Sequence, residues 1–128
     1  MRSEPGNVRA QILLAGALLE AGDFAGTEAA LRHGLEMRPE FGETSLALGF
    51  FLLDRGRPVE AARSFERVMG DEPEKSPLAM TGMVRAILRL GMIPEAEAWL
   101  AAIPVFFRHQ PSFQDLEEHV RAAGGGGR

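Results

Sequence analysis

Residues 48–73 read LGFFLLDRGRPVEAARSFERVMGDEP. Gly56 and Pro58 separate an apolar run from a stretch in which apolar and charged residues are interspersed. A glycine ends a helix readily because it adopts the left-handed conformation, and a proline suits the first turn of the next helix, where a backbone N–H has no intrahelical partner. The segment therefore predicts a helix, a tight turn and a second helix that stops before Pro73.

The same pattern occurs again about 34 residues earlier and about 35 residues later. Gly56 has counterparts in Gly22 and Gly91, and Phe65 has counterparts in Leu31 and Leu100. The first unit also keeps the closing proline, which the third unit lacks. Three equivalent helix hairpins follow from this repetition, with helices expected over 8–21, 24–37, 43–55, 58–70, 77–90 and 94–103.

A seventh helix is expected after the third hairpin, over about 113–123. Ser112 and Asp115 form a capping-box pattern at its start. Its apolar stripe would cover the open end of the stack. The expected organisation is a disordered start (1–6), three repeats (7–40, 41–75 and 76–103), an irregular link (104–111), a capping helix (112–123) and a glycine-rich tail (124–128).

This pattern resembles the tetratricopeptide repeat, over residues 7 to about 103. The likeness is strongest in the second unit and partial in the third. It implies an all-α fold, a right-handed α-solenoid of three helix hairpins plus the capping helix, because one hairpin cannot bury its apolar face alone. The positions that carry the resemblance are Leu48, Gly49, Gly56, Ala61, Phe65, Val68 and Pro73, with Gly22, Asp23, Phe24, Leu35 and Pro39 in the first unit.

The resemblance also implies a function, because the first helices of such repeats line a concave groove that holds a segment of another protein. We expect a protein-binding module, an adaptor or chaperone, whose partner supplies an apolar or amphipathic helix. Small bacterial type III secretion chaperones of this family are similar in size and repeat number. The expected partner-binding residues are Ile12, Gly16, Leu19, Leu46, Phe50, Leu53, Leu78, Thr81, Arg85, Leu88 and Arg89.

Helical spacing supports this groove independently in the second unit. Leu46, Phe50 and Leu53 fall at i, i+4 and i+7, on a stripe separate from Leu48 and Leu52. The alternative is that these residues widen the core or pack against the last helix. A carboxylate clamp like that of heat-shock co-chaperones is not expected, since its matching positions are Ile12, Gly16, Ala47, Leu78 and Gly82.

A second function remains open, in which the chain is a scaffold or oligomerisation domain of a larger protein and forms a homo-oligomer. Phe106 and Phe107 are adjacent in the link and could mediate self-association. The competing interpretation is that one of them fills the seam between the third unit and the last helix.

Composition argues against other classes of function. The 128 residues carry a net charge of −4 and no cysteine, which disfavours nucleic-acid partners and excludes thiolate chemistry. His33, His109 and His119 have no metal-ligand spacing, and no phosphate-binding glycine loop or catalytic group is recognisable. We therefore expect that the protein is not an enzyme, binds no cofactor or metal and does not insert into a membrane.

The apolar run from Ile12 to Leu19 is too short to span a membrane, and we interpret it as part of the first repeat instead of a signal peptide. A cytoplasmic location is therefore expected.

Overall fold

The computed structural model describes residues 5–125, and this part of the chain contains helices and no strand. Two short 3-10 helices, η1 (Pro73–Lys75) and η2 (Val105–Phe107), lie in the connections. The α-helices are α1 (Pro5–Glu20), α2 (Phe24–Met37), α3 (Gly42–Asp54), α4 (Pro58–Met69), α5 (Pro77–Arg89), α6 (Ile93–Ala102) and α7 (Pro111–Gly125).

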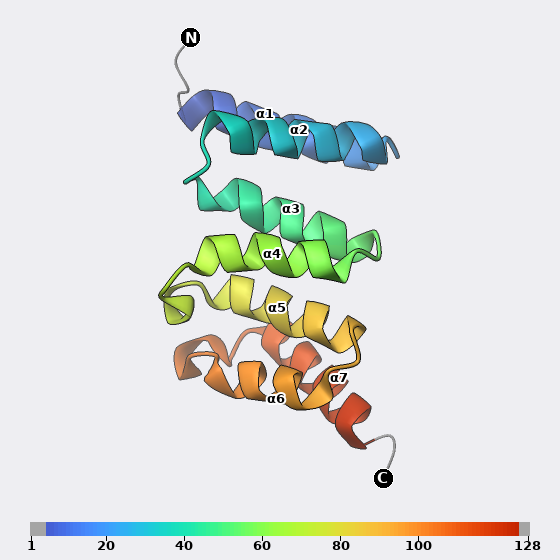
Figure 1. The fold of residues 1–128 in the computed structure, drawn as a ribbon, viewed down its shortest axis with the longest axis vertical. Helices are drawn as coiled ribbons and strands as arrows, with labels where there is room; N and C mark the ends of the chain where they lie inside the picture. Colours follow the sequence, from blue (N-terminus) through green and yellow to red (C-terminus); the bar gives the residue numbers. More distant parts are fainter. Residues whose placement is uncertain (1–4, 126–128) are drawn as a thin grey trace.

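The first six helices form three consecutive hairpins that stack along the long axis of the molecule (Figure 1). Each helix packs against the next one in the chain, and α3 also contacts both α1 and α5. The first helices of the three hairpins are therefore neighbours along one side of the stack. This confirms the predicted solenoid of helix hairpins.

The three hairpin turns have the same hydrogen-bonded geometry. Gly22, Gly56 and Gly91 have φ angles of 80°, 74° and 76°, in the left-handed region that favours glycine. The residue after each glycine donates its N–H to a carbonyl five positions earlier, as in a Schellman motif. These bonds are Asp23 to Leu18 at 2.9 Å, Arg57 to Leu52 at 2.9 Å and Met92 to Ile87 at 3.2 Å. The predicted glycine punctuation is confirmed at all three turns.

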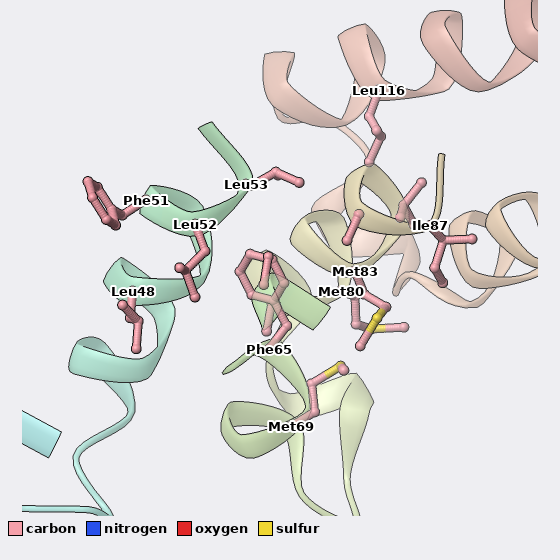
Figure 2. Close-up of a cluster of buried hydrophobic side chains, with 14 of the residues drawn as sticks. Leu48, Phe51, Leu52, Leu53, Phe65, Met69, Met80, Met83, Ile87 and Leu116 are labelled. Carbon is pink, nitrogen blue, oxygen red and sulfur yellow. The ribbon is translucent and has the colours of Figure 1, made fainter. Parts of the chain in front are cut away.

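The centre of the core is the ring of Phe65, which is fully buried on α4. Figure 2 shows this ring between leucines of α3 and methionines of α5. Two glycines make room for it: a Cβ atom at Gly49 would lie 2.6 Å from Cε1 of Phe65, and one at Gly82 would overlap the same ring. Phe65 therefore joins the second hairpin to the third.

A charged cluster joins the first hairpin to the second. Arg57 donates to Glu28 of α2 at 2.7 Å and to Glu60 of α4 at 2.8 Å, and Arg32 pairs with both carboxylates. Hydrogen bonds from Arg57 are the main reason that the pKa of each glutamate lies below its usual value. This cluster was not predicted from the sequence, because its members are separated along the chain.

Helix α7 lies against α5 and α6 and buries Phe113, Leu116 and Val120 there. It begins at Pro111, so Ser112 lies inside its first turn and the predicted capping box is wrong. The carbonyl of Gln110 instead accepts from the N–H groups of Phe113 and Gln114.

The ends of the described region also differ from the expected boundaries. Helix α1 already includes residues 5–6, which were expected to be disordered, and α7 includes Gly124 and Gly125 from the expected tail. The link 104–111, which was expected to be irregular, contains the 3-10 helix η2, and its last residue begins α7. Residues 1–4 and 126–128 of the predicted start and tail lie outside the described residues.

Candidate functional site

An apolar cleft lies between the first helices of the first two hairpins, and we call it the α1–α3 cleft. Its volume is about 250 Å³. Helices α1 and α3 form its two walls, and Thr27 and Leu31 of α2 complete the lining. The wall residues are Ile12, Ala15, Gly16 and Leu19 on α1 and Ala47, Phe50, Phe51 and Asp54 on α3. Four of the predicted partner-binding residues, Ile12, Gly16, Leu19 and Phe50, thus lie together.

Gly16 keeps the middle of this cleft open. A Cβ atom at this position would meet no other atom within 4 Å, so the missing side chain leaves accessible space. Leu19 remains 43% exposed beside it, and Ile12 is half-buried. The cleft therefore offers apolar surface to an incoming group without rearrangement of the helices.

The cleft continues toward the N-terminal ends of α1 and α3. A second hollow of about 210 Å³ is lined by Arg9, Ile12, Leu13 and Glu43, so it shares Ile12 with the first. Arg9 and Glu43 pair across it at 3.6 Å. Leu13 is 75% exposed there and was not among the predicted residues. The signal for it was present, because Ile12, Leu13 and Leu14 are three consecutive apolar residues on a helix with apolar side chains all around.

Phe50 belongs to both the cleft and the core. It lines the α1–α3 cleft on one side, and its ring meets the edge of Phe65 with centroids 4.9 Å apart. Such an edge-to-face pair stabilises packing beyond the area that it buries. Phe50 therefore positions the cleft wall as well as lining it.

Two predicted partner-binding residues lie in the core instead. Leu53 is 3% exposed and Thr81 is 2% exposed, and the Thr81 hydroxyl donates to the carbonyl of Leu78. Figure 2 shows Leu53 directed toward α5. Neither side chain is accessible to a partner in this structure, because α3 and α5 pack together along that face. Leu46 is also partly buried against the core.

The other predicted partner-binding residues of the third hairpin have mixed environments. Leu78 is exposed, whereas Arg85 and Leu88 are half-buried. Arg89 donates to the carbonyl of Leu53 at 3.1 Å, at the end of α3. The structure does not place these four residues in the α1–α3 cleft, so the candidate site is concentrated on the first two hairpins.

Phe106 and Phe107 have opposite environments. Phe107 is half-buried and packs against the core, as the seam interpretation expects, while Phe106 is 71% exposed. Trp99 is half-buried, packs against the core and lines a different hollow with Pro73 and Met80.

Within residues 5–125, no group of three or more histidine and acidic side chains converges as a metal site. In the same residues, no helix combines the length and the apolar character needed to cross a bilayer.

Comparison with known sequences agrees with this architecture. A search of curated proteins found no match. A profile described as Tetratricopeptide repeat matches residues 52–120, which is more than half of the chain and extends from α3 into α7. Together with the repeated turns and the stacked hairpins, this match shows that the chain belongs to the tetratricopeptide repeat family.

Proposed function

We propose that this protein is an adaptor or chaperone that binds an apolar or amphipathic helical segment of a partner protein in the α1–α3 cleft. Tetratricopeptide repeats mediate protein–protein interactions, and this general role applies to the family to which the chain belongs. The observation that carries the more specific proposal is the cleft itself, an apolar hollow with a glycine in its wall.

The shape and polarity of the cleft favour a helix as its occupant. An amphipathic helix docks through apolar side chains at i, i+3 or i+4, and i+7, which need a row of apolar hollows. Ile12 connects the two hollows into such a row. Charged groups stand at both ends, with Asp54 at one and the Arg9–Glu43 pair at the other. A helix with polar residues flanking its apolar stripe matches this arrangement.

Substitution of Gly16 tests the proposal with little risk to the fold. Gly16→Phe would fill the cleft, while Gly16→Ala adds one methyl group and is the matched control. Both replacements favour the helix, because glycine inside a helix costs roughly 0.5–1 kcal/mol relative to alanine. By contrast, Phe50→Asp would disturb the core through Phe65 and would not separate binding from folding.

The probe is an amphipathic helical peptide of about 18 residues, or five turns, selected from a phage-displayed library on the wild-type protein. We expect Gly16→Phe to raise its Kd at least about 30-fold, as loss of a binding hot spot does. Gly16→Ala should bind nearly as the wild type does. Fluorescence anisotropy measures both, and circular dichroism checks the fold. A peptide that binds Gly16→Phe as tightly as wild type, or a selection that yields no helical binder, would refute the proposal.

A further inference from the structure

An exposed apolar protrusion lies on the link between α6 and α7, and we call it the aromatic knob (Val105 and Phe106). The two side chains are 70% and 71% exposed. Apolar side chains this accessible and adjacent to one another mark interaction surfaces more often than isolated ones do. Nothing in residues 5–125 covers them.

Hydrogen bonds hold the knob in one conformation. The N–H groups of Phe107 and Arg108 donate to the carbonyls of Pro104 and Val105, both at 3.0 Å. The Arg108 side chain also donates to the carbonyls of Ala101 at 2.8 Å and Ile103 at 3.1 Å. Because the loop is already ordered, insertion of Phe106 into a pocket would cost little conformational entropy.

An apolar hollow, the Trp99 pocket, opens nearby on the third hairpin. Its volume is about 350 Å³, within the range of small-ligand pockets and large enough for an aromatic side chain. Only one of its lining residues is charged. They are Pro73 and Glu74 of η1, Met80 of α5, and Ala98, Trp99 and Ala102 of α6.

Figure 1 shows η1, the end of α6 and η2 at the same edge of the molecule, and these elements carry most of the pocket lining and the knob. Val105 follows Ala102 by three positions, so the two lie within about 11 Å even if the chain between them is extended. A two-fold symmetric contact requires one surface to carry both complementary features, because each patch meets its own copy. This edge satisfies that requirement.

Charge complementarity supports the same pairing. Glu74 stands in the wall of the Trp99 pocket and has no ion-pair partner among residues 5–125. Arg108 follows the knob and directs its guanidinium to neutral backbone carbonyls, so its positive charge is not neutralised by a carboxylate. When Phe106 enters a facing pocket, Arg108 approaches a surface that carries Glu74.

We propose that a second copy of this chain binds here, with the aromatic knob of each copy inserted into the Trp99 pocket of the other. The resulting dimer is two-fold symmetric and leaves the α1–α3 cleft of both copies open, since the cleft lies on the first two hairpins. It is a weak, concentration-dependent dimer, because one knob and one pocket per copy make a contact at the small end of specific interfaces. This inference is independent of the proposed binding of a partner helix.

The test measures mass by sedimentation velocity from about 1 μM to 1 mM, the range of weak association. Phe106→Ser removes the knob and keeps the pocket, while Ala98→Arg obstructs the pocket and keeps the knob. Each variant should raise the dimer Kd at least about 30-fold. Glu74→Arg should raise it about 5-fold at low salt and less at 1 M salt, because like charges then face each other.

Mixing the two variants provides the decisive measurement. Each variant alone loses both contacts, but a heterodimer of Phe106→Ser with Ala98→Arg keeps one intact knob and one intact pocket. The mixture should therefore associate more tightly than either variant alone. Val59→Ser, which removes an exposed apolar side chain from α4, is the control and should dimerise as wild type does.

Three results would overturn the proposal: a wild-type chain that stays monomeric at 1 mM, a Phe106→Ser variant that dimerises normally, or a mixture no tighter than its components. Equal loss of dimer in Val59→Ser would also contradict it. Circular dichroism of each variant shows that the fold is retained, and peptide binding in the α1–α3 cleft should be unchanged by Phe106→Ser.

Discussion

Phe65 occupies a space that exists because two of its neighbours have no side chain. Gly49 of α3 and Gly82 of α5 face the same ring, from the helices on either side of α4. In a helix interior, alanine is normally better than glycine by roughly 0.5–1 kcal/mol. Here an added methyl group would overlap the Phe65 ring, which opposes that preference. The ring cannot move away from one glycine without meeting the opposite side of its close-packed surroundings.

We expect Gly82→Ala to destabilise the protein by about 1–3 kcal/mol, the usual cost of overpacking, despite its gain in helix propensity. Gly49→Ala should act in the same direction. Gly16→Ala is the matched control and should stabilise slightly, because its added methyl group meets nothing within 4 Å. Urea unfolding measures all three. A double variant with Phe65→Leu should recover part of the loss, and a neutral Gly82→Ala would show that the ring is not confined.

Among the helices, the order and the turns could be predicted from the sequence, because glycine and proline have strong local preferences. Gly22, Gly56 and Gly91 end their helices as expected, with positive φ angles. The rotation of α3 could not be predicted equally well. Apolar residues surround this helix, so Leu53 and Phe50 were indistinguishable by pattern, although only Phe50 reaches the cleft.

The predicted site was incomplete for a related reason. On α1, Ile12 and Leu19 line the α1–α3 cleft, and their role in partner binding remains a prediction. Thr81 was misplaced because contact between α3 and α5 depends on the packing around Phe65, which sequence spacing does not reveal. The Trp99 pocket was missed because η1 and α6 come together only in three dimensions.

The cluster of Arg57, Glu28 and Glu60 links α2 to α4 and makes stability depend on pH. Hydrogen bonds from Arg57 lower the pKa of both glutamates below the ordinary value of 4.5. A carboxylate with a depressed folded pKa contributes stability above the unfolded pKa and loses it as the pH falls through the folded pKa. The contribution is therefore fully present at neutral pH and is lost as the pH falls from 4.5 through the lowered pKa values of the two glutamates.

Arg57→Gln should lower the melting temperature at pH 7, and the difference from wild type should shrink steadily as the pH falls from 5 to 3. Thermal unfolding followed by circular dichroism gives this difference at each pH. The exposed pair of Lys75 and Glu72 provides a control, since Lys75→Gln should have little effect at any pH. A difference that stays constant down to pH 3 would mean that Arg57 acts through packing alone.

Across the whole molecule, stability should decrease from the centre of the stack toward α1. Among residues 7–20 of α1, only the side chains of Val8 and Ala15 belong to the buried core, whereas α5 buries Met80, Met83 and Val84 together with other residues. In stacked repeats each unit is stabilised by its neighbours, and the first hairpin has a neighbour on one side within the described chain.

Amide hydrogen exchange should therefore be fastest in α1 and slowest in α5, because local opening of α1 exposes little core surface. Mass spectrometry of peptides from the native protein measures these rates without any substitution. Binding of a helical peptide in the α1–α3 cleft should slow exchange in α1 specifically. Equal rates in α1 and α5 would instead indicate that the chain opens as a single cooperative unit.

The ring of Phe65 also makes the contact between the second and third hairpins stiff, whereas the contact between the first and second hairpins is easier to deform. Curvature between the second and third hairpins cannot change unless the ring leaves the space between two glycines. The first hairpin is joined to the rest by the short connection 38–41 and by a half-buried charged cluster, which tolerate tilting more easily than a packed ring does. Partner helices of different width would accordingly be accommodated by a hinge motion of α1 and α2, while the remaining helices keep their positions.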